Sequence, residues 1–168
     1  MINVVLYEPE IPQNTGNIMR TCSVFKMQLH LIEPLGFSLD EKHLQRSGMD
    51  YIDDLKYFVY SNWNEFIKDK KGQFVYFTRY GMKSFEECIF NSNEDIYMVF
   101  GKESTGIDKK ILKDNLKNCY RIPMRSNARS LNLSNTVAIG AYECLRQVGF
   151  GDLSDREVIK GADFLLKC

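Results

Sequence analysis

Three polar stretches of the sequence hold the residues whose types and spacing could support chemistry. The longest, SLNLSNTVAIG at residues 130–140, leads directly into a helix-like segment. A helix start needs only one Ser or Asn at its N-cap, where the side-chain oxygen accepts a hydrogen bond from the first turn. Residues 126–135 contain six Ser and Asn side chains. This surplus predicts a binding site in addition to a helix that starts near Asn132.

A second stretch, VFGKESTGI at residues 99–107, ends a buried run with two glycines five positions apart. A phosphate-binding loop would continue with Lys and Ser or Thr, but Ile and Asp follow Gly106. The chain also has no GxGxxG motif. Nucleoside triphosphatases and nicotinamide- or flavin-dependent enzymes are therefore disfavoured. Gly101 is expected to let a ligand or another backbone segment approach closely.

The third stretch, EPEIPQNTGNIMRT, covers residues 8–21. Asn14 or Thr15 could cap a helix there. The apolar face of this helix would consist of Ile18, Cys22 and Phe25. Capping does not account for Asn17 and Arg20, which are neighbours on the surface of such a helix. An arginine in this position is either simply solvated or part of a ligand site.

The elements that position these stretches follow from hydrophobic periodicity. Strands are predicted at residues 2–7, 28–33, 55–60, 73–78, 95–100 and 119–124. Helices are predicted at residues 14–27, 40–46, 62–71, 108–117, 133–148 and 154–167. Because strands and helices alternate, the predicted fold class is α/β, a mostly parallel sheet covered by helices. Ligands of such sheets bind at the carboxyl ends of strands, where the three polar stretches lie.

Length and composition predict one globular domain over residues 1–168, with 44% hydrophobic and 26% charged residues. The start, MINVVLYEP, has no basic leader and only a short apolar run, so we expect neither a signal peptide nor a membrane partner. Five dispersed cysteines without a CxxC pair indicate reduced thiols and a cytoplasmic location. With only two histidines beside them, a zinc site is not expected.

Charge is balanced over the whole chain but not along it. Residues 101–129 carry eight basic and three acidic side chains, so this segment is +5 and the remainder −5. The lysines of residues 109–117 repeat like the outer face of a helix and indicate a solvated surface. The zero net charge argues against a strongly basic nucleic-acid-binding protein. Arg121, Arg125 and Arg129 differ from the lysines because they flank a predicted strand and loop.

Taken together, NTGNIMRT, VFGKESTGI and the segment from IPM to SLNLSNTVAIGAYE resemble, in order and spacing, the three motifs of the SPOUT superfamily of RNA methyltransferases. The start YEPEIPQNTGNIMR is similar, more narrowly, to the TrmL-type enzymes of that superfamily. Those enzymes methylate the ribose 2′-oxygen of the wobble nucleotide, a cytidine or uridine, in certain tRNAs. The resemblance covers about residues 1–150.

The resemblance implies a C-terminal deep trefoil knot at about residues 75–150, with residues 151–168 as a closing helix outside the shared motifs. It implies S-adenosylmethionine as methyl donor, no metal, and a homodimer. The small positions Ala138, Gly140 and Ala141 are expected to press against the partner. The implied RNA is the anticodon stem-loop of tRNA, from leucine isoacceptors. Two alternatives stay open: methylation of another tRNA or rRNA position, and a non-catalytic cofactor-binding protein associated with RNA.

The resemblance also assigns roles to individual residues. The methyl donor is expected to contact Phe77, Gly101, Ile122, Ser130 and Leu131. The catalytic set is expected to be Asn14, Arg20, Glu103, Asn132, Ser134 and Asn135. Asn132, Ser134 and Asn135 are expected to fix the loop and position the ribose. Asn14 and Arg20 are expected to face the RNA. Because a guanidinium stays protonated in proteins, we expect Arg20 to stabilise a developing alkoxide or to hold a phosphate. Glu103 is expected to orient Arg20 or to accept a proton.

One position departs from the superfamily pattern. These enzymes commonly have arginine in the second motif where this chain has Thr105. Lys102, Arg125 and Arg129 are candidates to supply the contact that this arginine makes.

Overall fold

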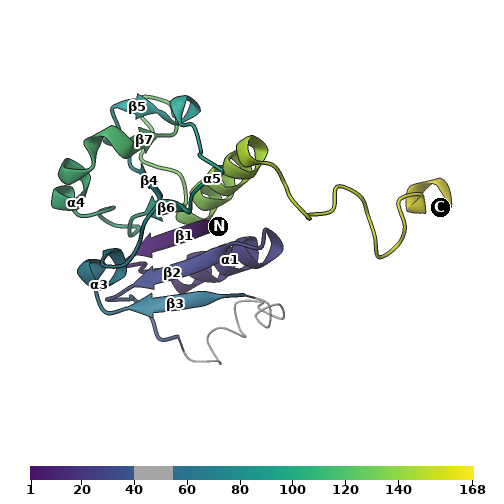
Figure 1. Cartoon of the computed structure of the whole chain (residues 1–168), viewed down its shortest axis with the longest axis horizontal. Coiled ribbons are helices and arrows are strands. Elements are labelled where there is room, and N and C mark those ends of the chain that lie inside the picture. The colour runs from purple at the N-terminus through teal and green to yellow at the C-terminus, as the bar shows by residue number, and fades with distance from the viewer. Residues whose placement is uncertain (40–54) are drawn as a thin grey trace.

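Seven parallel strands form a single sheet in the part of the chain that the computed structural model describes, residues 1–39 and 55–168 (Figure 1). Their order across the sheet is β3-β2-β1-β6-β4-β7-β5. The strands are β1 (Ile2–Tyr7), β2 (Gln28–Ile32), β3 (Tyr57–Tyr60), β4 (Gln73–Phe77), β5 (Lys83–Ser84), β6 (Ile96–Phe100) and β7 (Cys119–Arg121). The predicted parallel α/β architecture is confirmed, and β5 is a short strand that the sequence pattern did not reveal.

Helices cover both faces of the sheet (Figure 1). One face packs against α1 (Pro12–Val24) and α5 (Leu133–Val148). The other face packs against α3 (Trp63–Ile67) and α4 (Lys109–Asp114). The described residues also form three short 3-10 helices: η2 (Phe85–Glu87), η3 (Leu116–Asn118) and η4 (Phe164–Leu166).

The central strands are apolar because both of their faces are covered. In β1, Val4 and Leu6 belong to the core beneath α1 and α5, whereas Val5 belongs to the core on the opposite face. All five residues of β6 are buried in the same alternating way. Successive side chains of a strand point to opposite faces, so a two-sided core requires an unbroken apolar run.

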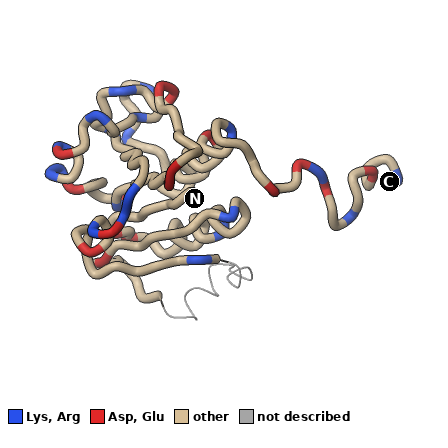
Figure 2. The backbone as a smooth tube through the Cα atoms, in the orientation of Figure 1, with Lys and Arg blue, Asp and Glu red and all other residues tan. Residues whose placement is uncertain are grey.

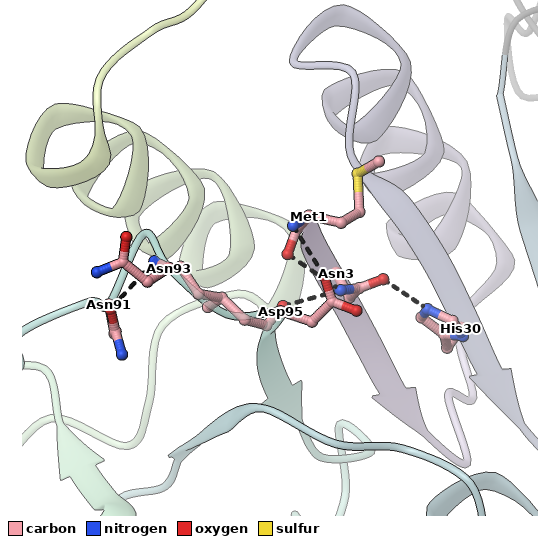
Figure 3. Close-up of polar contacts among 7 residues, drawn as sticks. Met1, Asn3, His30, Asn91, Asn93 and Asp95 are labelled. Carbon is pink, nitrogen blue, oxygen red and sulfur yellow. Dashed lines mark hydrogen bonds and ion pairs between the residues drawn. The ribbon is translucent and has the colours of Figure 1, made fainter.

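A buried polar network joins the first strands (Figure 3). The Asn3 amide donates to the Ile96 carbonyl at 3.1 Å, and the Asn3 side-chain oxygen lies 3.0 Å from Nε2 of His30. Nδ1 of His30 lies 3.0 Å from the Tyr60 hydroxyl. Since Asn3 Oδ1 only accepts, His30 is assigned the Nε2–H tautomer. The N-terminal ammonium of Met1 pairs with Asp95 at 2.9 Å beside this network.

The predicted helix at residues 154–167 is wrong. Residues 151–168 leave the domain as an extended tail that contains only η4 (Figure 1). Gly151 and Gly161 have positive φ angles of 60° and 89°, and Ile159 is 91% exposed. A short helix gains most of its stability from packing an apolar face, and this segment of the described chain has no such surface.

The remaining element boundaries differ by a few residues. α1 begins at Pro12, so neither Asn14 nor Thr15 is its cap, and both are buried within the helix. β7 ends at Arg121, two residues before Pro123, which has no backbone N–H to donate to a neighbouring strand. The helix predicted at residues 40–46 lies outside the described residues.

Candidate active site

A cavity of about 660 Å³ lies at the carboxyl ends of β4, β6 and β7. This volume is in the range of small-molecule and cofactor sites. Its lining includes all five residues expected to contact the methyl donor: Phe77, Gly101, Ile122, Ser130 and Leu131. Residues from segments far apart in the sequence therefore meet at one edge of the sheet, as expected for a ligand site of an α/β protein.

The Phe77 ring forms one apolar wall and is held by close packing. It stacks on Phe100 with ring centroids 4.5 Å apart and contacts Phe85 at 4.7 Å. α5 packs directly on these rings, because a Cβ added at Gly140 would lie 2.9 Å from Cζ of Phe77. Gly140 and Ala141 are thus buried in this chain's own core, which contradicts their predicted contact with a partner, whereas Ala138 is half-buried. The exposed apolar residues of α5 are Ile139 and Tyr142.

Gly101 permits a close approach of backbone, one of the two possibilities expected from the sequence. A Cβ at Gly101 would lie 2.3 Å from both Gly106 C and Ile107 N. The loop after β6 therefore folds back on itself, with a bridge between Lys102 and Gly106. Gly106 completes the turn with a φ of 78°, a conformation that side chains disfavour.

The Glu103 carboxylate caps α1, although it lies some 90 residues further along the chain. It accepts hydrogen bonds from Glu10 N at 2.8 Å, Ile11 N at 3.3 Å and Asn14 Nδ2 at 2.9 Å. Ile11 stands at the N-cap position and provides no side-chain acceptor. A carboxylate at a helix N-terminus satisfies free N–H groups and interacts favourably with the helix dipole. Glu103 thus fixes the start of α1 beside the cavity.

Two further contacts join the loop after β1 to the loop after β6. Lys102 Nζ pairs with Glu8 at 2.6 Å, and Ser104 donates to Glu10 from its hydroxyl at 2.8 Å and its backbone N–H at 2.9 Å. The hydrogen bond with Glu8 raises the pKa of Lys102, and the Ser104 hydroxyl lowers the pKa of Glu10. Burial, assisted by Glu8, raises the pKa of Tyr7 to about 12. Tyr7 thus stays neutral beside the charged pair.

Asn132 is the N-cap of α5, as predicted. Its side-chain oxygen accepts from Ser134 N at 2.9 Å, Ser134 Oγ at 2.6 Å and Asn135 N at 3.3 Å. Its side-chain amide donates to Asn14 Oδ1 at 2.9 Å. Hydrogen bonds therefore run from Glu103 through Asn14 and Asn132 to the first turn of α5, and they connect all three polar stretches.

The structure separates the six expected catalytic residues into two groups. Asn14, Glu103 and Asn132 line the cavity. Ser134 is buried behind the Asn132 cap, while Asn135 and Arg20 are exposed and are not part of the lining. Sequence reasoning selected no residue directly after β4, yet Thr78, Arg79 and Tyr80 also line the cavity. Their position at the end of a predicted strand was the available signal.

Within residues 1–39 and 55–168, no group of three or more His, Cys, Asp or Glu side chains is placed to hold a metal ion. None of the helices described there is long and apolar enough to cross a membrane.

The fold and the position of the cavity define a methyltransferase of the SPOUT class. A solved structure described as giving structural insights into the 2-OH methylation of C/U34 on tRNA aligns with a TM-score of 0.81 and 37% identity, covering 88% of this chain and 96% of that chain. The family model for the SpoU rRNA methylase family matches residues 1–142. The chain belongs to this family.

Two curated relatives are similar over nearly their whole length. A tRNA (cytidine(34)-2′-O)-methyltransferase from Saccharophagus degradans is 44% identical over 152 residues, covering 89% of this chain and 97% of the relative. A protein from Listeria monocytogenes, provisionally named for the same activity, is 51% identical over 153 residues, covering 90% of each. The deep trefoil knot implied by the resemblance stays a prediction.

Proposed function

We propose that this chain transfers a methyl group from S-adenosylmethionine to the ribose 2′-oxygen of nucleotide 34, a cytidine or uridine, in tRNA. The observation that carries the proposal is that Phe77, Gly101 and Leu131 line one cavity together with Asn14 and Asn132. A donor site and a set of ordered amides beside it are what such a transfer requires. The names of the two curated relatives support nucleotide 34 of tRNA as the target.

The cavity suits S-adenosylmethionine in size and chemistry. Phe77, Ile122 and Leu131 provide apolar surface for an adenine ring, and the backbone of the loops after β6 and β7 provides polar groups for its edge. When bound, this cofactor supplies an electrophilic methyl group on a sulfonium. Transfer to a hydroxyl then requires in-line orientation and loss of the hydroxyl proton.

The hydrogen-bonded chain of Glu103, Asn14 and Asn132 would hold the receiving ribose in place. The side-chain amides of Asn14 and Asn132 already have fixed partners, so the geometry of this edge is set before RNA binds. Arg20 lies on α1, beyond Asn14 along the helix. Its guanidinium is exposed and outside the cavity lining, so it would hold a phosphate next to the reacting nucleotide.

The remaining parts of the proposal concern partners and location. The exposed side chains of Ile139 and Tyr142 on α5, together with Val24 on α1, give a homodimer an apolar surface to cover. Sedimentation of the purified protein tests the dimer. The RNA partner is the anticodon stem-loop of tRNA, with leucine isoacceptors as the expected set, and the protein would act in the cytoplasm, where tRNA is available.

Turnover decides between this function and its alternatives. Purified protein is incubated with labelled S-adenosylmethionine and bulk tRNA, followed by digestion to nucleosides and mapping of the methylated position. The expected product is 2′-O-methylcytidine or 2′-O-methyluridine at the wobble position of leucine tRNAs, and a transcript with 2′-deoxyribose at that position should not react. Methylation elsewhere in tRNA or rRNA would favour a different target. Cofactor binding without transfer would favour a non-catalytic protein.

A further inference from the structure

The loop that follows β4 presents an aromatic ring at the mouth of the cavity. Tyr80 lines the cavity, yet its side chain is 62% exposed. The Arg79 guanidinium lies over the ring, with Cζ 5.8 Å from the ring centroid. A large exposed aromatic side chain with a cation beside it is a typical surface for stacking unpaired nucleic-acid bases.

The backbone beneath Tyr80 is fixed against β7. Thr78 N donates to the Tyr120 carbonyl at 3.0 Å, and Thr78 Oγ1 accepts from Tyr80 N at 3.2 Å. Arg121 Nη1 donates to the Arg79 carbonyl at 3.0 Å. A Cβ added at Gly81 would lie 2.5 Å from Tyr120 C, so the loop packs directly on the strand. The backbone that carries the ring is therefore fixed before a ligand arrives, which lowers the entropic cost of binding.

The charge around the ring matches a nucleic-acid backbone. The cavity lining contains five basic side chains and one acidic side chain, Glu103. The basic residues are Arg79, Lys102, Lys109, Arg121 and Arg129. Figure 2 shows further Lys and Arg positions along the lobe that carries α4, β5 and β7. Lys102 is paired with Glu8, and Glu103 is hydrogen-bonded to the start of α1. The positive charge at the cavity mouth therefore comes mainly from the arginines.

We infer that Tyr80, with Arg79 beside it, is a stacking platform for an unpaired base of the substrate RNA next to the reacting nucleotide. This inference rests on the proposed function, because it takes RNA as the ligand of the cavity mouth. Arg79 and Arg121 pair with the phosphates on either side of the stacked base. Stacking is tolerant of base identity, so the platform selects an unpaired loop over a duplex and leaves the choice of tRNA to other contacts.

Three variants test the platform. Tyr80→Ala removes the ring, Tyr80→Phe keeps it without the hydroxyl, and Met82→Ala is the matched control. Met82 is 85% exposed in the same loop and is not part of the cavity lining. For each protein, Kd is measured by fluorescence for an anticodon stem-loop and for a fully paired RNA hairpin. Kd for S-adenosylmethionine is measured by calorimetry.

Tyr80→Ala is expected to raise Kd for the stem-loop by about 5- to 150-fold, the effect of losing one stacked base. Tyr80→Phe and Met82→Ala should stay within about 2-fold of wild type, since stacking persists in both. Binding of the paired hairpin and of S-adenosylmethionine should not change among the variants.

Two results would overturn the inference while leaving the proposed function intact. One is equal stem-loop affinity for Tyr80→Ala and Met82→Ala. The other is a loss of S-adenosylmethionine affinity in Tyr80→Ala, which would assign the ring to the cofactor. If the wild-type protein bound the cofactor but neither bound nor methylated any RNA, the proposed function would fail, and the platform with it.

Discussion

The side-chain amide of Asn132 donates a 2.9 Å hydrogen bond to the side-chain oxygen of Asn14, 118 positions earlier in the chain. Asn14 in turn donates to Glu103 at 2.9 Å. An asparagine side chain both donates and accepts, so it can transmit orientation from one loop to the next. The starts of α1 and α5 are thereby fixed relative to each other at the edge of the cavity.

Asn132→Asp separates the capping role of this residue from its link to Asn14. Aspartate still accepts from Ser134 N and Asn135 N and suits a helix N-terminus, so we expect the free energy of unfolding to stay within about 1 kcal/mol of wild type. It cannot donate to Asn14, and we expect methyl transfer to fall at least about 10-fold because the ribose is misplaced. Urea denaturation and initial rates measure the two effects. Wild-type activity in Asn132→Asp would show that the link is dispensable.

Asn14→Asp is expected to be destabilising in a pH-dependent way. The new carboxyl would lie beside Glu103, and repulsion would raise its pKa above the unfolded value of about 3.9. The folded state would then bind the proton more tightly than the unfolded state, so the variant loses stability relative to wild type as pH rises. We expect a loss of about 1–3 kcal/mol at pH near 8 and a smaller loss near 5.

The control for this pH dependence is Asn17→Asp, an exposed position on the same helix. Urea denaturation at the two pH values gives the difference from wild type for each variant. If both aspartate variants showed the same dependence on pH, the contact between Asn14 and Glu103 would not be its source.

Local signals in the sequence were enough for some parts of this site. The cap at Asn132 was predictable because donor and acceptor lie within three residues, and the apolar runs located β1, β4 and β6 because both faces of these strands are covered. The five residues assigned to the methyl donor by resemblance do line one cavity. For the cap and the strands the information lies within one segment, whereas the donor residues come from three segments and were assigned by resemblance.

Other parts depend on contacts between distant segments. Pro12, at the first position of α1, is typical of helix starts, but the carboxylate that caps this helix comes from Glu103 and is not encoded near Ile11. From the sequence, Gly140 is predicted to contact a partner helix. In the structure it instead packs on the rings of Phe77 and Phe100. The tail at residues 151–168 has an apolar pattern without a surface to pack on, and periodicity alone does not distinguish that case from a docked helix.

His30 should make the fold sensitive to mild acid. Burial, together with the charge of Lys70, lowers the pKa of His30 to about 4, below the unfolded value of about 6.5. The unfolded state therefore binds the proton first as pH falls. The contribution of neutral His30 to the free energy of unfolding is fully present above about pH 6.5. It is lost progressively down to about pH 4, by at most about 1.4 kcal/mol per pH unit.

His30→Gln removes the titrating ring and should reduce that dependence while lowering stability at neutral pH, because the Tyr60 and Asn3 contacts are disturbed. The measurement is the free energy of urea unfolding at several pH values between 7 and 5. Parallel curves for wild type and His30→Gln would contradict the assignment of a neutral buried histidine.

Arg129 is exposed at the rim of the cavity and should contribute a phosphate contact. Each basic group that neutralises a phosphate of single-stranded RNA releases about 0.7 counterions. The association constant therefore falls with salt, and Arg129→Ala should make the slope of its logarithm against log salt less negative by about 0.7. The stem-loop affinity is measured from about 50 to 200 mM salt. Arg156→Ala is the matched control, because Arg156 is also exposed but lies on the tail that leaves the domain. An unchanged slope in Arg129→Ala, or an equal change in both variants, would place the RNA backbone elsewhere on the protein.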